Sequence, residues 1–240
     1  MKRLLFSVIF IIVTLFPILN NSAVLAQSGY LYTYAVENPG GQIVIKAVNP
    51  VNPGSGVDFL VTSPPANFSL YQASISQNGL WIALVFSDGY NGRLRVVNTV
   101  SLAAIDLNEN VFVRSSPSLL SESYRSIIWS QDNTRLAFLG LTSNGGTDVY
   151  IYSMTSNSLV NLTSNTTIQY QLAWSNDSTR LAIFSTDCNG ACIANISIYN
   201  TTTNALQSTF DISSITPSIA VSGDAVLCHL QWSPDSNHIS

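Results

Sequence analysis

Short runs of apolar residues, several of them alternating with polar ones, follow one another along the chain after about residue 30. Within residues 124–165 the runs are YRSIIWS, RLAFLGL, DVYIYSM and LVNLT, and within residues 170–212 they are YQLAWS, RLAIFS, NISIYN and ALQSTF. They are rich in Val, Ile, Tyr and Phe, and a period of two residues is typical of β-strands. Beyond the first 26 residues no window shows an apolar period of 3.6. The chain is therefore predicted to be all-β.

One short phrase recurs at the start of each group of runs. It reads ISQNGLWIAL around Ser76, WSQDNTRLAF around Ser130, WSNDSTRLAI around Ser175 and WSPDSNHI around Ser233. Uneven spacings of roughly 40–60 residues indicate one supersecondary unit repeated with loops of variable length. The Asp in the middle of the last three copies is expected to accept backbone N–H groups and close a tight hairpin. These turn-forming residues are Asp132, Asp177 and Asp235.

Four-stranded units at this spacing, without helices, predict a β-propeller of antiparallel blades over residues 27–240. The predicted units cover about 30–65, 71–115, 124–165 and 170–212, and another begins at 226–240. In the unit 71–115 the fourth run is expected at NVFVR, residues 110–114. About four blades are present, and we expect the ring to be incomplete in this chain. A closed four-bladed ring is the alternative.

Large apolar residues occupy the same place in the first strand of each unit. We expect them to lie in the blade core, wedged between adjacent blades, because each buries a large apolar surface. A role as sugar-stacking platforms is the alternative. The residues are Trp129, Trp174 and Trp232, with Ile75 at this place in the predicted repeat 71–115.

The phrase W-S-x-D-x-x-R-L-A-F, followed by G-G-T-D-V-Y-I-Y and L-V-N-L-T, resembles the WD40-like repeat of TolB-type propellers. The resemblance covers residues 124–164 and 170–207 well and 71–100 moderately. It implies an exported bacterial propeller. The family includes the periplasmic TolB protein, a protein-interaction platform, and the N-terminal propellers of prolyl-oligopeptidase-type serine peptidases. Unlike TolB itself, this sequence leaves only about three residues between the expected cleavage site and the first strand.

The first 26 residues have the pattern of a signal peptide. Lys2 and Arg3 precede the apolar run LLFSVIFIIVTLFPIL, and Val24-Leu25-Ala26 provides small residues before a cleavage site at Gln27. An uncleaved membrane anchor is the alternative, but the run is short for a span and contains Pro17. We therefore expect an exported protein, periplasmic or extracellular, with no stable membrane anchor after cleavage.

The charge of the chain disfavours nucleic acid as a partner. Its formal net charge is −4, and removal of Lys2 and Arg3 leaves seven basic and 13 acidic residues, a net charge of −6. So few cations do not neutralise a phosphate backbone. A protein or peptide partner is expected, with carbohydrate as the alternative.

Three cysteines fit an oxidising compartment. Cys188 and Cys192 enclose Asn-Gly-Ala between two predicted strands, and we expect a disulfide between them. Reduced thiols are the alternative, and a metal site lacks ligands nearby. Cys228 is either a buried free thiol or half of a bridge to another chain.

No residue pattern in the sequence indicates catalysis, a cofactor or a metal. The nucleophile elbow G-x-S-x-G is missing, and the two histidines, His229 and His238, are too few for a histidine metal site. Asp148 is expected to cap a hairpin, with a place facing a ligand channel as the alternative. Arg135 and Arg180 hold the same repeat position and are expected either to face solvent or to pair across blades.

The leading functional hypothesis is therefore a non-catalytic, exported propeller that binds a protein or peptide. The alternative is the substrate-gating propeller of a serine peptidase whose catalytic domain lies beyond residue 240. Since a fold by itself does not define a function, the identity of the partner stays open.

Overall fold

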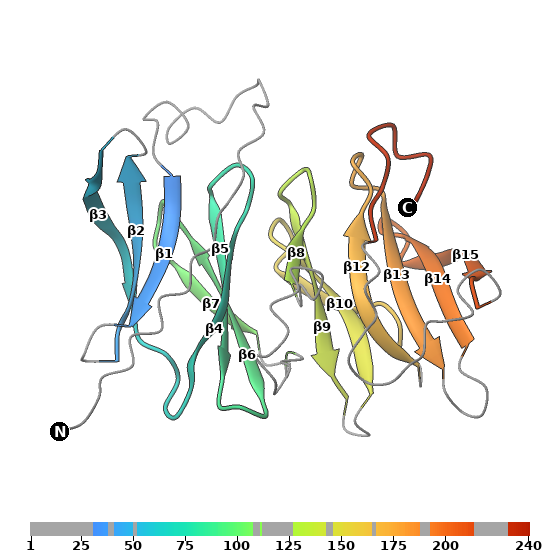
Figure 1. Cartoon of the computed structure of the whole chain (residues 1–240), viewed down its shortest axis with the longest axis horizontal. Helices are drawn as coiled ribbons and strands as arrows, with labels where there is room; N and C mark the ends of the chain where they lie inside the picture. Colours follow the sequence, from blue (N-terminus) through green and yellow to red (C-terminus); the bar gives the residue numbers. More distant parts are fainter. Residues whose placement is uncertain are drawn as a thin grey trace. The chain divides into compact units, whose positions relative to one another are not determined.

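The computed structural model of the chain describes residues 31–37, 41–49, 52–107, 111, 127–142, 146–164, 167–187, 193–213 and 230–240. These residues form β-strands joined by turns, and no helix occurs among them (Figure 1). The predicted signal segment, the three cysteines and His229 lie outside the described residues. The chain divides into two compact units, residues 1–88 with 95–106 and residues 89–94 with 107–240.

The first unit contains a three-stranded antiparallel sheet and most of a four-stranded one. The first sheet has the order β1 (Leu31–Glu37), β2 (Ile43–Asn49), β3 (Asn52–Thr62). The second has the order β4 (Ser69–Ile75), β5 (Trp81–Ser87), β6 (Gly92–Asn98), β7 (Ala104–Leu107). Ile43 of β2 packs with Ile82, Leu84 and Phe86 of β5, all fully buried, and Ile75 packs against this cluster. The apolar run of β5 thus forms the centre of the unit.

The fourth strand of this second sheet differs from the sequence prediction. It is β7, residues 104–107, whereas Val111 of the expected run NVFVR makes an isolated bridge with Gly140. The side-chain oxygen of Asn98 accepts hydrogen bonds from the backbone N–H groups of Val100 and Ser101, both at 2.9 Å. Leu102 adopts a φ of 58°, so the chain reverses direction directly after β6. The short sequence AIDL is weakly apolar and therefore escaped the hydrophobic pattern.

The second unit contains two four-stranded antiparallel sheets in which each strand lies beside its neighbour in sequence. One consists of β8 (Ile127–Trp129), β9 (Arg135–Leu141), β10 (Thr147–Ser153) and β11 (Ser158–Asn161). The other consists of β12 (Ile168–Trp174), β13 (Arg180–Asp187), β14 (Ile193–Asn200) and β15 (Ala205–Asp211). These eight strands lie where the sequence pattern predicts them.

The two sheets of the second unit pack face to face over a continuous apolar core. Ala137, Leu139, Val149 and Ile151 on the first sheet meet side chains of the second sheet, and these residues are 0–4% exposed. The partners on the second sheet are Leu172, Trp174, Leu181, Ile183 and Tyr199. Residues 230–240 form a short hairpin, closed by a bridge between Trp232 and Ile239, that packs on the opposite face of the second sheet.

Candidate functional site: a ladder of repeated turns

The recurring phrase folds into the same turn in each copy. In the first copy within the second unit, the Ser130 hydroxyl donates to Asp132 Oδ1 at 2.5 Å, and the Thr134 N–H donates to the same oxygen at 3.0 Å. The Arg135 N–H in turn donates to Ser130 Oγ at 3.0 Å. The carboxylate therefore holds together the turn between the first and second strands of the blade.

The other copies repeat this geometry with different residues. Asp177 accepts from Ser175 at 2.6 Å and from the Thr179 N–H at 2.9 Å, and Asp235 accepts from Ser233 at 2.6 Å and from the Asn237 N–H at 3.1 Å. In the first unit Asn78 does the same with its amide oxygen, at 2.8 Å from Ser76 Oγ and 3.0 Å from the Leu80 nitrogen. An amide oxygen thus suffices for the turn, and the negative charge of the aspartates is an additional property.

The three turns of the second unit are bonded to one another in sequence order. We call them the turn ladder: residues 130–135, 175–180 and 233–238. The Asp132 N–H donates to Ser178 Oγ at 2.9 Å, and the Asp177 N–H donates to Ser236 Oγ at 3.2 Å. Both serines adopt a φ of 60°, a conformation costly for a residue with a Cβ. Ser178 and Ser236 are 2% and 3% exposed. Glycine would adopt this φ more easily, but it has no hydroxyl to accept the hydrogen bond from the preceding turn.

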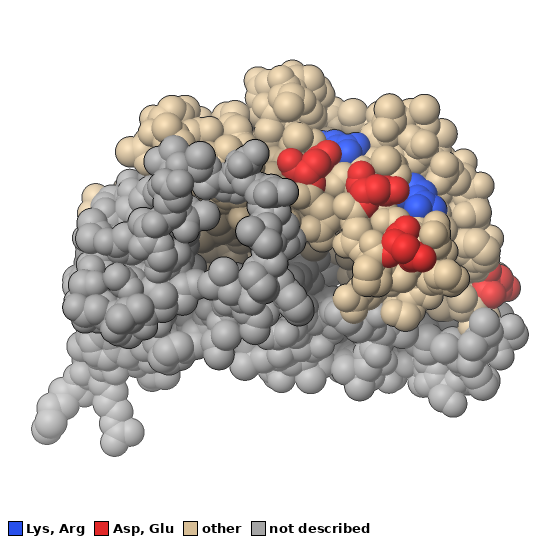
Figure 2. Space-filling view, turned by 90° about the horizontal axis from the view of Figure 1, so that it is seen from above, with Lys and Arg blue, Asp and Glu red and all other residues tan. Residues whose placement is uncertain are grey.

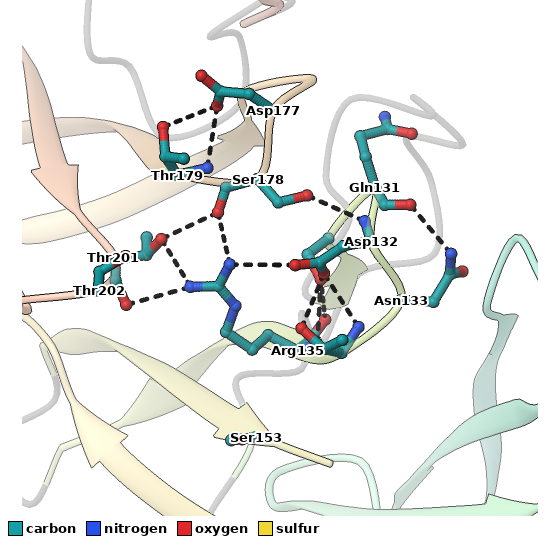
Figure 3. Close-up of polar contacts among 12 residues, drawn as sticks. Gln131, Asp132, Asn133, Arg135, Ser153, Asp177, Ser178, Thr179, Thr201 and Thr202 are labelled. Atoms are coloured by element: carbon teal, nitrogen blue, oxygen red, sulfur yellow. Dashed lines mark hydrogen bonds and ion pairs between the residues drawn. The ribbon is translucent and has the colours of Figure 1, made fainter. Parts of the chain in front are cut away.

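An arginine strengthens each step of the ladder. Arg135 donates to the Ser178 carbonyl at 2.6 Å and to the Thr201 hydroxyl at 2.8 Å (Figure 3). Its guanidinium also lies 5.1 Å from the ring centre of Trp174. Arg180 repeats this one blade later, donating to the Ser236 carbonyl and lying 4.7 Å above the ring of Trp232. Of the two alternatives left by the sequence, pairing across blades is the one observed.

Two tryptophans of the repeat, Trp174 and Trp232, lie in the seams between successive blades. Trp174 is 6% exposed and donates its indole N–H to the Ile128 carbonyl at 3.3 Å, while Trp232 is 5% exposed and donates to the Ala173 carbonyl at 2.9 Å. Burial and the guanidinium above each ring leave no face of Trp174 or Trp232 open for a sugar. Trp129 is partly buried, and its indole nitrogen has no hydrogen-bond partner among the described residues.

The carboxylates of the ladder stay ionised and partly open to solvent. Partial burial acts to raise the pKa of Asp132, but hydrogen bonds from Ser130 and Thr134 and the nearby Arg135 outweigh it and lower that pKa. The same balance lowers the pKa of Asp177, and the hydrogen bond from the Ser233 hydroxyl is the main cause that lowers the pKa of Asp235 to about 2.

Exposure leaves these carboxylates accessible to a partner. Their side chains are 42%, 46% and 58% exposed for Asp132, Asp177 and Asp235. Arg135 Nη2 lies 3.4 Å from Asp132 Oδ2, and Arg180 Nη2 lies 3.8 Å from Asp177 Oδ2. Figure 2 shows acidic side chains lying beside basic ones on one face of the described residues. The ladder therefore presents fixed acceptor and donor groups in alternation.

Asp148 lies elsewhere, at the start of β10. It is 5% exposed and accepts hydrogen bonds from Asn161 Nδ2 at 2.9 Å and from the Thr163 hydroxyl at 3.2 Å. Asn161 is the last residue of β11 and Thr163 lies just after it, so these contacts join the third and fourth strands of one blade.

Among the described residues, no group of three or more His, Cys, Asp or Glu side chains could hold a metal ion. Within the same residues, no helix is long and apolar enough to cross a bilayer. His238 is 81% exposed and lies 3.9 Å from Asp235, at the repeat position of Arg135 and Arg180. The chemistry that the ladder offers is hydrogen bonding and ion pairing.

Sequence reasoning found the aspartates and tryptophans but missed Ser178, Ser236 and Thr201. Ser178 and Ser236 follow the repeated Asp directly, which is a signal visible in the sequence. Thr201 lies in the turn between β14 and β15, and nothing local relates it to Arg135.

No protein-family profile and no curated protein matches this chain. Among solved structures, it is similar to the tricorn protease, with a TM-score of 0.53 and 10% identity over 88% of this chain and 17% of that one. It is also similar to TolB from Acinetobacter baumannii (TM-score 0.47, 12% identity, 75% of this chain and 40% of that one). A third is the β-propeller domain of the Trilobed protease from Pyrococcus furiosus (TM-score 0.44, 13% identity, 60% and 43%).

The chain spans less than half the length of each of these proteins. At such low identities the likeness concerns the fold alone. Together with the repeated four-stranded antiparallel sheets, the likeness to the tricorn protease confirms the β-propeller fold class predicted from the repeats.

Proposed function

We propose that this chain is an exported, non-catalytic β-propeller that binds a protein or peptide through its turn ladder. The observation that carries the proposal is the constant geometry of the ladder. Each turn is fixed internally by an aspartate and is bonded to the next turn through a serine hydroxyl and a guanidinium. A surface ordered in this way binds a partner with little loss of conformational freedom of its own.

The partner is expected to carry cationic or N–H donor groups. Three ionised carboxylates on one edge, in a chain with net charge −4, attract such groups and orient them. Arg135 and Arg180 occupy part of the carboxylates of Asp132 and Asp177, whereas Asp235 lies near His238, so the ladder favours a patterned peptide over a simple polycation. Export rests on the sequence of the first 26 residues and is part of this proposal.

A selection from a displayed peptide library tests the binding function. The full chain is immobilised, enriched peptides are synthesised, and their affinity and integrity are measured. We expect enriched peptides with basic residues, bound without cleavage. Binding should weaken about tenfold, or about 1.4 kcal/mol, in the triple variant D132N/D177N/D235N, because up to three surface ion pairs of at most about 1 kcal/mol each are lost together.

The matched control comes from the chain itself, because Asn78 already forms the same turn with an amide oxygen. The triple variant should therefore keep the circular dichroism spectrum of the parent chain at neutral pH, while its melting temperature falls because the stability contributed by the ionised carboxylates is lost. Unchanged affinity in a correctly folded triple variant would disprove binding through the ladder. Cleavage of the peptides, abolished by substitutions within this chain, would disprove the non-catalytic assignment.

The second candidate function is the propeller of a serine peptidase. It is favoured by the likeness to a protein described as the tricorn protease. The coding sequence after the codon for Ser240 decides between the two: a G-x-S-x-G nucleophile elbow followed by Asp and His establishes the peptidase.

A further inference from the structure

One of the four described copies of the repeated turn contains an Asn-Gly pair. The turn between β4 and β5 reads SQNGL, whereas the three turns of the ladder have Asp-Asn or Asp-Ser in place of Asn78-Gly79. At an Asn-Gly pair the side-chain amide reacts readily with the following backbone nitrogen, because glycine has no Cβ to hinder the approach. Asn78 is therefore the residue of these turns with the strongest chemical tendency to deamidate.

Deamidation at this pair proceeds through a cyclic imide. The Gly79 backbone nitrogen loses its proton and attacks Cγ of Asn78, so that a new C–N bond forms. The bond from Cγ to the side-chain nitrogen breaks, and that nitrogen leaves as ammonia. Water then opens the imide at one of its two carbonyl groups and produces aspartate or isoaspartate at position 78. Each conversion adds one negative charge and changes the formal net charge of the chain from −4 to −5.

In the folded turn both reacting groups are held in hydrogen bonds. The Gly79 N–H donates to the Ser76 carbonyl at 2.9 Å. The side-chain oxygen of Asn78 accepts hydrogen bonds from the Ser76 hydroxyl at 2.8 Å and from the Leu80 N–H at 3.0 Å. These bonds must break before the nitrogen can lose its proton and the side-chain amide can rotate toward it.

The neighbouring turn, between β6 and β7, holds the reactive pair from the other side. Thr99 is 6% exposed, its hydroxyl donates to the Gly79 carbonyl at 2.7 Å, and its N–H donates to the Leu80 carbonyl at 2.9 Å. Each of these hydrogen bonds contributes about 1 kcal/mol, so the closed turn should be opened only in a small fraction of molecules.

The aspartate product fits the turn that the asparagine formed. In the three turns of the ladder, Asp132, Asp177 and Asp235 accept the same serine hydroxyl with a carboxylate oxygen, at 2.5, 2.6 and 2.6 Å. A carboxylate at position 78 can therefore accept from Ser76 and Leu80 as the amide oxygen does.

We propose that Asn78 is a deamidation site controlled by the folding of its turn. The closed turn protects the Asn-Gly pair, the reaction starts only from the opened turn, and the aspartate product closes the turn again. The site uses no residue of the ladder and goes beyond the binding function.

Ageing of the full chain at mildly alkaline pH, with peptide mass spectrometry, measures the rate at Asn78 in buffer and in concentrated urea. Three further Asn-Gly pairs, at Asn91, Asn144 and Asn189, calibrate the rate in urea, and the last two lie outside the described residues. We expect Asn78 to react at least about tenfold more slowly in the folded chain than in urea, which corresponds to about 1.4 kcal/mol of opening. An equal or faster reaction in the folded chain overturns the proposal.

Two variants test the protection by the turn. Ser76→Ala removes a donor to the Asn78 side chain and should raise the rate in the folded chain about fivefold or more, with no change in urea. Ser69→Ala, the same change at an exposed position of β4, is the matched control and should alter neither rate. If Ser76→Ala does not fold, Thr99→Val decides, since it removes only the bond to the Gly79 carbonyl and should raise the rate in the same direction. An unchanged rate in the folded variant overturns the protection by the turn.

Gly79→Ser and Asn78→Asp test the chemistry and its product. Gly79 has a φ of 70°, close to the 60° of Ser178 and Ser236 at the same place, and a Cβ on it would meet no atom within 4 Å. Gly79→Ser should therefore fold and react several-fold more slowly in urea, and an undiminished rate would contradict attack by this nitrogen. Asn78→Asp should keep the circular dichroism spectrum of the parent chain, and loss of the fold would show that the aspartate product does not close the turn.

Discussion

The second unit has two seams with the same contacts and different coverage. At the seam between β8–β11 and β12–β15, Trp174, Arg135 and Ser178 form the ladder contacts, and the sheets behind them bury each other across three strands. At the seam between β12–β15 and residues 230–240, Trp232 and Ser236 make the same contacts, but only a hairpin lies behind them. The ladder contacts are therefore present both where a complete sheet lies behind them and where, among the described residues, only a hairpin does.

Removal of the tryptophan should have the largest effect, and the effect should differ between the seams. Trp174→Ala is expected to lower the free energy of unfolding by about 3–5 kcal/mol, as for other buried aromatic residues. Trp232→Ala should lower it by less than about 2 kcal/mol, since the hairpin can separate locally while the rest stays folded. Urea denaturation with hydrogen exchange of residues 230–240 measures both effects. Equal losses would show that the hairpin is as integral to the core as a complete blade.

A pair of isoleucines tests coverage without disturbing the ladder. Ile151 and Ile198 hold the same repeat position, but Ile151 is 4% exposed and Ile198 is only partly buried. Ile151→Ala should cost about 2–4 kcal/mol and Ile198→Ala about 1 kcal/mol, because less buried apolar area is lost at the partly exposed Ile198. The difference between the two denaturation midpoints is the observable. A reversed order would mean that Ile198 is covered in solution.

Arg135 should contribute through geometry as well as charge. Arg135→Ala is expected to cost about 2–3 kcal/mol, from the hydrogen bonds to Ser178 and Thr201 and the contact with the Trp174 ring. Arg135→Lys should recover less than half of this loss, because an ammonium group does not reproduce the planar fork. Thermal unfolding of the three proteins provides the comparison, and complete recovery by lysine would contradict the role of the fork.

The smallest expected effect is the dependence of stability on acid. The pKa values of Asp132 and Asp177 are lowered from their ordinary 3.8, and that of Asp235 is lowered to about 2. Depressed carboxylate pKa values contribute stability that is fully present above the unfolded value and is lost as the pH falls through the folded value. Stability should therefore decline between about pH 4 and pH 2, and D132N/D177N/D235N should flatten that decline. Parallel pH profiles for variant and parent would assign the acid sensitivity to other carboxylates.

Local rules allowed the strands and turns of this fold to be predicted from the sequence. The period of two in RLAIFS and the repeated Asp after Trp-Ser follow from neighbouring residues alone, and both are present in β13 and in the turn at Asp177. Prediction failed where the contact depends on distant residues. The strand AIDL is only four residues long, and its Asp106 forms an ion pair with Arg95 at 2.6 Å, which no apolar pattern reports.

The same limit applies to the candidate site. The sequence showed that Arg135 and Arg180 share a repeat position. It did not show where their side chains point, because the acceptors of Arg135 include Thr201, 66 residues away. The sequence placed the tryptophans between blades because of their size and their place in the strand; Trp174 and Trp232 are buried there, whereas Trp129 is only partly buried.

The ladder also has a polarity. At both seams the earlier turn supplies the donors, an aspartate N–H and a guanidinium, and the later turn supplies the acceptors, a serine hydroxyl and a carbonyl. Such an interface is heterologous, so one ladder end cannot pair with an identical end about a two-fold axis. Modules joined by these turns can be added only head to tail. Gene duplication could therefore lengthen the array by whole blades without creating a symmetric dimer.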